Sequence, residues 1–90
     1  MIVARRFVIS GRVQGVGFRW FVKDAATREG AGGWVRNLPD GRVEAIVEGD
    51  SESVTRVERA LRTGPRGARV ATFTVDDELP QGFGGLFDIR

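Results

Sequence analysis

A glycine-rich segment followed by an arginine is the part of this sequence best suited to bind an anion. Gly11–Gly17 holds three glycines in seven residues, and Arg19 follows where a helical pattern has just begun. Main-chain N–H groups in such a turn point toward one spot, where the positive end of the helix dipole also acts. Gly15 and Gly17 let the backbone curl without a Cβ in the way. Because a guanidinium binds oxyanions through paired hydrogen bonds, Arg19 could complete a cradle for a phosphate-sized dianion.

The absence of two generic phosphate-binding motifs does not decide whether this segment binds an anion or only connects a strand to a helix. The Walker pattern is absent, since Lys23 is the only lysine and follows no such loop. The dinucleotide pattern also fails, because Trp20 stands at the position of its third glycine. From the residues alone, a merely tight connection between a strand and a helix is the simpler interpretation, and an anion site is the alternative.

Asn37 is the second candidate, a polar residue in an otherwise apolar stretch just before the turn Pro39-Asp40-Gly41. Asparagine often starts a turn by bonding its own backbone, which is the structural interpretation. The functional interpretation depends on topology. If the end of this strand lies near the start of the helix that carries Arg19, the two side chains face a shared cleft.

The elements needed to position these residues follow from hydrophobic periodicity. Apolar residues recur at helical spacing from Phe18 to Ala26 and again from Val54 to Leu61, while short alternating runs indicate strands. The predicted strands cover 7–9 with its neighbours, 33–38, 42–48, 70–75 and 86–89. This order predicts one α+β domain over residues 1–90, a ferredoxin-like βαββαβ sandwich. Its antiparallel sheet has four to five strands and carries two helices on one face.

Composition excludes several kinds of chemistry. The chain has no Cys and no His, which excludes thiolate nucleophiles, a Ser-His-Asp relay, His-ligated metals and Cys-based metal sites. Any enzyme chemistry is therefore left to Arg, Lys, carboxylates, amides, hydroxyls and main-chain N–H groups. The net charge of +2 is not that of a dedicated nucleic-acid binder. No apolar run is long enough to span a membrane and the start lacks the layout of a signal peptide, so a cytoplasmic protein is expected.

Other conspicuous side chains receive structural interpretations. We expect Trp20 and Trp34 to pack in the core or at its rim. The acidic residues Glu44 and Glu48 are expected on a solvated face, and Asp40 is explained by its turn.

The two candidate segments together resemble the acylphosphatase family. Gly11-Arg12-Val13-Gln14-Gly15-Val16-Gly17-Phe18-Arg19 is similar to one signature of that family, and Gly33-Trp34-Val35-Arg36-Asn37-Leu38-Pro39-Asp40-Gly41 is similar to the second, at the expected separation. The segments 43–50, 64–70 and 87–90 are similar as well, so the resemblance covers nearly the whole chain.

The resemblance implies hydrolysis of the carboxyl-phosphate anhydride of acyl phosphates to carboxylate and inorganic phosphate, without a metal, a cofactor or a covalent intermediate. It assigns Arg19 and Asn37 as catalytic residues: Arg19 binds the phosphoryl group and Asn37 positions the attacking water. The phosphate-binding set it implies is Gln14, Gly15, Val16, Gly17, Phe18 and Arg19. Inorganic phosphate is expected as product and competitive inhibitor, and the protein is expected to be a monomer that binds neither nucleic acid nor membrane.

Two alternatives come from other functional classes. The first is a non-catalytic anion-binding or regulatory module with the same fold, as found inside larger maturation proteins. The second is an RNA-binding domain with the same element order, which stacks bases on aromatic residues of its central strands. The strand 42–48 has no aromatic residue and carries two acids, which argues against RNA binding.

Overall fold

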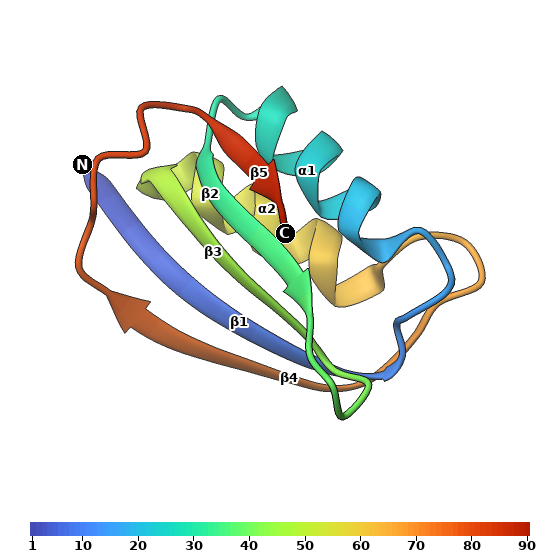
Figure 1. Ribbon diagram of the computed structural model, residues 1–90. Helices are drawn as coiled ribbons and strands as arrows, with labels where there is room; N and C mark the ends of the chain where they lie inside the picture. Colours follow the sequence, from blue (N-terminus) through green and yellow to red (C-terminus); the bar gives the residue numbers. More distant parts are fainter.

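Two helices lie side by side on one face of a five-stranded sheet (Figure 1). The structure is a computed structural model that describes residues 1–90. Its elements in chain order are β1 (Ile2–Arg12), α1 (Phe18–Arg28), β2 (Gly32–Asn37), β3 (Val43–Asp50), α2 (Ser51–Thr63), β4 (Arg69–Glu78) and β5 (Phe87–Ile89). The predicted ferredoxin-like α+β fold is therefore confirmed.

The sheet is mixed, which corrects the prediction of an antiparallel sheet. Its strand order is β4-β1-β3-β2-β5, and the pairs β1–β4, β1–β3 and β2–β3 are antiparallel. The last strand, β5, pairs with β2 in parallel. After β4 the chain crosses from one edge of the sheet to the other before it forms β5 (Figure 1). It therefore enters β5 in the direction of β2, a geometry that a hairpin connection does not allow.

The core lies between the sheet and the two helices, and it is built from the predicted apolar stripes. On α1 the fully or nearly fully buried residues are Phe18, Val22, Ala25 and Ala26, and on α2 they are Val54, Val57 and Leu61. Phe7, Ile9, Val35, Val43, Ala45 and Val47 complete the layer from the sheet. The central strands β1 and β3 contribute alternate residues to this core, as expected for strands whose one face is covered by helices.

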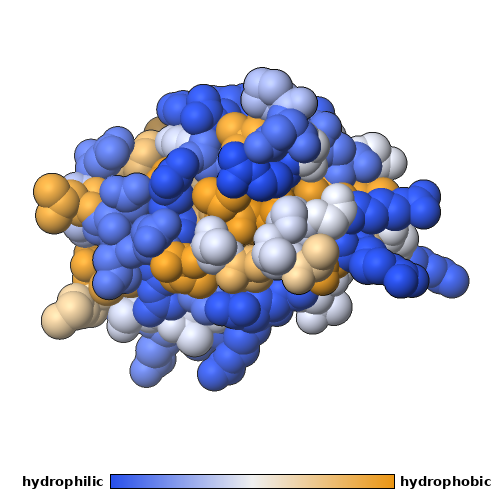
Figure 2. All heavy atoms as spheres, turned by 90° about the horizontal axis from the view of Figure 1, so that it is seen from below, coloured by the Kyte–Doolittle hydropathy of each residue, from blue (hydrophilic) through white to orange (hydrophobic).

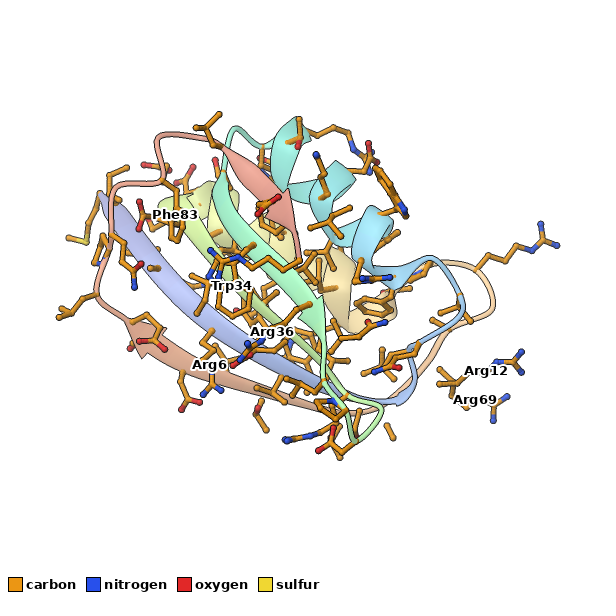
Figure 3. The ribbon with its side chains drawn as sticks, viewed as in Figure 1. Arg6, Arg12, Trp34, Arg36, Arg69 and Phe83 are labelled. Atoms are coloured by element: carbon orange, nitrogen blue, oxygen red, sulfur yellow. The ribbon has the colours of Figure 1, made fainter.

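The face of the sheet away from the helices holds a buried carboxylate, which corrects the expectation of a solvated Glu44. Glu44 is only 2% exposed. Arg6 of β1 binds it from one side, and the Nε of Arg36 of β2 lies 2.7 Å from its Oε1 on the other. Figure 3 shows these two arginines pointing toward one another on the same side of the sheet. The strand pattern predicted the direction of Glu44, but it could not show that two arginines on neighbouring strands would cover it.

The pKa of Glu44 predicts how this ion pair contributes to stability. Burial opposes ionisation, but hydrogen bonds from Arg36 and Arg6 outweigh it and hold the pKa below its ordinary value of 4.5. The group therefore stabilises the fold fully above about pH 4.5, and this contribution is lost as the pH falls through the lowered pKa. We expect Glu44→Gln to lower the free energy of unfolding by about 2 kcal/mol at pH 7.

Urea denaturation at pH 7 and at pH 3 measures this effect. The stability difference between wild type and Glu44→Gln should shrink at pH 3, because the charge contribution is lost as the pH falls below the ordinary pKa of 4.5 toward the lowered one. Asp76→Asn, at an exposed position of β4 without an ion pair, is the matched control. An equal difference at both pH values would contradict the proposed charge contribution.

Glu48 fastens the connection between β4 and β5, which corrects the expectation that it is solvated. It is 6% exposed, and its carboxylate accepts main-chain hydrogen bonds from Gln81, Gly82 and Phe83 at 2.5–2.9 Å. The Cβ of Phe83 in turn lies against Gly32 of β2. These contacts hold the connection against the sheet and so direct the chain into β5.

The outer surface is dominated by charged side chains. Figure 2 shows the side of the molecule on which β4 lies, with a hydrophobic area surrounded by hydrophilic residues. Trp34 lies on the outer face of the sheet, partly buried, with the guanidinium groups of Arg36 and Arg90 over its ring at 5.2 and 4.8 Å from the centroid. This is the rim packing expected for Trp34. Neither helix has the length and apolar character needed to cross a bilayer.

Candidate active site

The loop between β1 and α1 leaves a row of main-chain N–H groups without acceptors. Gly15 and Gly17 adopt left-handed conformations, with φ of 74° and 75°. No main-chain N–H from Gln14 to Gly17 donates a hydrogen bond within the protein. Phe18 begins α1, and the first N–H groups of a helix have no partners within it. A Cβ at Gly15 or Gly17 would meet no atom within 4 Å, so these positions require glycine for their backbone angles rather than for space.

Gln14 ties this loop to the hairpin between β2 and β3. Its Nε2 donates to the carbonyl oxygens of Leu38 and Arg42 at 2.9 and 3.0 Å. Since Leu38 directly follows Asn37, the bond holds the loop next to the end of β2. The side chain of Gln14 therefore has a structural role, while its main-chain N–H stays available.

Arg19 lies in the first turn of α1 without an Asp or Glu partner. Its Nη1 donates to the main-chain oxygen of Arg90 at 3.2 Å, and the side chain is partly buried. Every salt bridge in the protein involves other residues. The guanidinium therefore keeps donors that can bind an incoming oxyanion.

Asn37 and Arg19 border the same hollow, as the topological argument predicted. The hollow has a volume of about 110 Å³, small against the 300–1,000 Å³ typical of pockets for drug-sized ligands. The Asn37 side chain forms no hydrogen bond within the protein, so its amide is free to bind water. The residues that line the hollow are Val13, Gln14, Gly15, Gly17, Phe18, Arg19, Trp20 and Asn37.

The charge around this hollow favours an anion. Arg19 is the only charged residue that lines it, and the first turn of α1 has no acidic side chain to offset the helix dipole. Val16 does not line the hollow, because its side chain packs against the core. Only its main-chain N–H could serve a ligand. No three acidic residues lie together in a group that could hold a metal ion.

A larger hollow, of about 500 Å³, lies between β1 and α2, and two of its three arginines are paired with carboxylates, Arg59 being the exception. Arg5 bonds Glu58 at 3.2 Å and Arg56 bonds Glu29 at 2.8 Å. In the smaller hollow the main-chain N–H groups of the loop and the Asn37 side chain lack partners, and Arg19 has no Asp or Glu beside it. Available hydrogen-bonding groups, rather than volume, identify it as the candidate site.

Trp20 is the side chain at the site that sequence reasoning interpreted wrongly. It was expected in the core or at its rim, yet it is 69% exposed and lines the hollow. On α1 it lies about 200° around the axis from both Phe18 and Val22, which are buried, so helical periodicity already places it opposite the core. The contact between Arg19 and Arg90 was also missed, because no sequence pattern indicated that β5 would lie beside the start of α1.

Comparisons with known proteins agree on one family. The family model described as acylphosphatase matches residues 5–89. An acylphosphatase of Anaeromyxobacter dehalogenans is 51% identical over 88 residues, which cover 98% of this chain and 95% of that protein. The crystal structure of acylphosphatase from Bacillus subtilis has a TM-score of 0.92 at 34% identity, covering 100% of this chain and 99% of that one.

The fold also occurs as a small part of larger proteins. The crystal structure of T. kodakarensis HypF matches with a TM-score of 0.84 at 34% identity. The match covers 98% of this chain and 12% of that one. The fold alone therefore does not distinguish an independent enzyme from a domain of a larger protein. The matches that cover nearly all of two acylphosphatases favour the enzyme.

Proposed function

The chain belongs to the acylphosphatase family and hydrolyses acyl phosphates, and we propose that Arg19 and the amides of Gln14–Phe18 hold the phosphoryl group while Asn37 positions the attacking water. The observation that carries this assignment of roles is a loop with unpaired N–H groups that lines a hollow together with Arg19 and Asn37. The substrate is an acyl phosphate, and the products are a carboxylate and inorganic phosphate.

The phosphoryl group fits the donors that the loop offers. Its equatorial oxygens accept hydrogen bonds from the loop amides, and the Arg19 guanidinium binds two of them as a fork. Charge on these oxygens is stabilised by groups already fixed in place by the glycine conformations and by Gln14. Little reorganisation is then needed as the transition state forms.

The attacking water needs position more than activation. The Asn37 amide oxygen accepts a hydrogen bond from the water and directs its oxygen at phosphorus, in line with the bond that breaks. The new P–O bond forms as the P–O bond to the acyl group breaks, and the acyl oxygen leaves with the electron pair as a carboxylate. Carboxylic acids have pKa values of about 4, so this leaving group needs no proton. The water proton passes to a phosphoryl oxygen.

This division of roles explains how the reaction proceeds without a histidine or a cysteine. Positioning and electrostatic stabilisation supply most of the catalysis in phosphoryl transfer. We propose that the enzyme acts as a monomer. We propose a cytoplasmic location, with neither nucleic acid nor membrane as a partner.

The proposed mechanism predicts activity without a divalent metal. Purified protein should hydrolyse benzoyl phosphate at an unchanged rate in excess EDTA, and inorganic phosphate should inhibit competitively. Stopped assays of benzoate release measure both effects. A loss of turnover in EDTA that Mg²⁺ restores would overturn the metal-free mechanism, while leaving the family assignment intact.

A further inference from the structure

We propose that Trp20 is an aromatic platform for the acyl group, which makes this enzyme selective for aromatic over small aliphatic acyl phosphates. This inference rests on the proposed phosphoryl cradle, because it concerns the part of the substrate that projects from it. An exposed tryptophan costs hydrophobic free energy, since its large apolar surface stays in water. At 69% exposure Trp20 is one of five large hydrophobic residues left exposed, and it is the one that borders the cradle.

Trp20 is placed where the acyl group must go. When the phosphoryl group occupies a hollow of about 110 Å³, the rest of the substrate has to extend out of it. The other apolar residues of its lining, Val13 and Phe18, are 1% and 2% exposed and belong to the core. Among the residues that line the hollow, Trp20 therefore offers the only exposed large apolar surface.

Trp20 also lines a second hollow. It has a volume of about 230 Å³ and is lined by Trp20, Lys23, Asp24 and Thr27. These residues lie on the solvent side of α1, opposite its buried stripe, so the hollow is separate from β2 and Asn37. In-line attack puts the leaving acyl group opposite the water, which means on the side away from Asn37. The exit of the acyl group from the small hollow and the in-line geometry of attack both direct this group toward Trp20.

Lys23 restrains the indole that forms this platform. Its Nζ lies 6.0 Å from the centre of the Trp20 ring, one helical turn further along α1. A ring held in this way loses less conformational freedom when a planar group stacks on it. A benzoyl group presents such a plane, whereas an acetyl group presents one methyl.

The test compares two substrates in one variant. Trp20→Ala should raise KM for benzoyl phosphate about tenfold with kcat nearly unchanged, because stacking acts equally on ground state and transition state. KM for acetyl phosphate and the inhibition constant of inorganic phosphate should stay within about twofold. Trp20→Phe keeps a planar ring and should restore most of the benzoyl preference. Leu79→Ala, at another exposed apolar residue outside the hollow, is the matched control and should change neither substrate.

The outcomes separate this inference from the cradle itself. If Trp20→Ala changes both substrates and phosphate inhibition together, Trp20 supports the start of α1 and the platform is refuted. If both substrates keep their wild-type constants, the acyl group lies elsewhere and the platform is equally refuted. If wild type hydrolyses both substrates but phosphate does not compete, the cradle assignment fails instead. Circular dichroism verifies the fold of each variant. If Trp20→Ala does not fold, the preference of Trp20→Phe for benzoyl over acetyl phosphate still tests the platform.

Discussion

Arg19→Ala is expected to lower kcat/KM for acetyl phosphate about a thousandfold and to abolish competitive inhibition by inorganic phosphate. The guanidinium is the only charged side chain that lines the hollow, so its removal takes away the main partner of the phosphoryl oxygens. Loss of this group weakens both the bound phosphate and the transition state. Steady-state kinetics with phosphate as inhibitor measure both effects on the same preparation.

The control for Arg19 lies on the same helix. Arg28→Ala removes an exposed arginine from the last turn of α1, where it pairs only with Asp24, and should leave the kinetics unchanged. Arg19→Lys keeps the charge but loses the planar fork, and is expected to recover only a small part of the activity. Normal phosphate inhibition in Arg19→Ala would show that the cradle has been assigned to the wrong place.

The positions of Arg19 and Asn37 could be predicted because local patterns define both elements. The apolar stripe beginning at Phe18 sets the start of α1, and the Asp-Gly turn after Asn37 sets the end of β2. In the βαββαβ order the start of α1 and the end of β2 lie at the same end of the sheet. The shared hollow followed from that argument before any contact was known.

The features that were missed depend on contacts between distant segments. Glu44 alternates correctly along β3, yet its burial requires arginines from β1 and β2. Glu48 is buried by a connection more than thirty residues further along the chain. Likewise, β5 is only three residues long, and its parallel pairing follows from the path that this connection takes. Alternation predicts the direction of a side chain but not what covers it.

The unpaired amides of the loop link the fold to the reaction. Polar groups that fold without partners cost stability unless water or a ligand satisfies them, so a row of them is uncommon. Here the left-handed glycines and the Gln14 bonds hold the loop open instead of letting it close into a turn. Since Gly15 and Gly17 are exposed, water can satisfy these amides until a ligand binds, and the same arrangement gives the phosphoryl oxygens fixed donors.

Asn37→Ala tests the positioning of the attacking water, and we expect it to lower turnover without weakening the binding of inorganic phosphate. The amide binds water rather than the phosphoryl group in our assignment, so kcat is expected to fall about a hundredfold or more. The inhibition constant of inorganic phosphate should stay within about twofold, because Arg19 and the loop amides are untouched. This split is the opposite of the joint loss expected for Arg19→Ala.

Two further variants make the result specific to the amide of Asn37. Asp40→Asn alters the same hairpin outside the hollow and should keep wild-type turnover. Asn37→Asp keeps the shape but brings a negative charge toward the phosphoryl group, so it should lose turnover and also weaken phosphate inhibition. Full turnover in Asn37→Ala would exclude the water-positioning role. A parallel loss of turnover and phosphate inhibition there would instead make Asn37 a phosphate ligand, and the water would then have to be held by the loop amides alone.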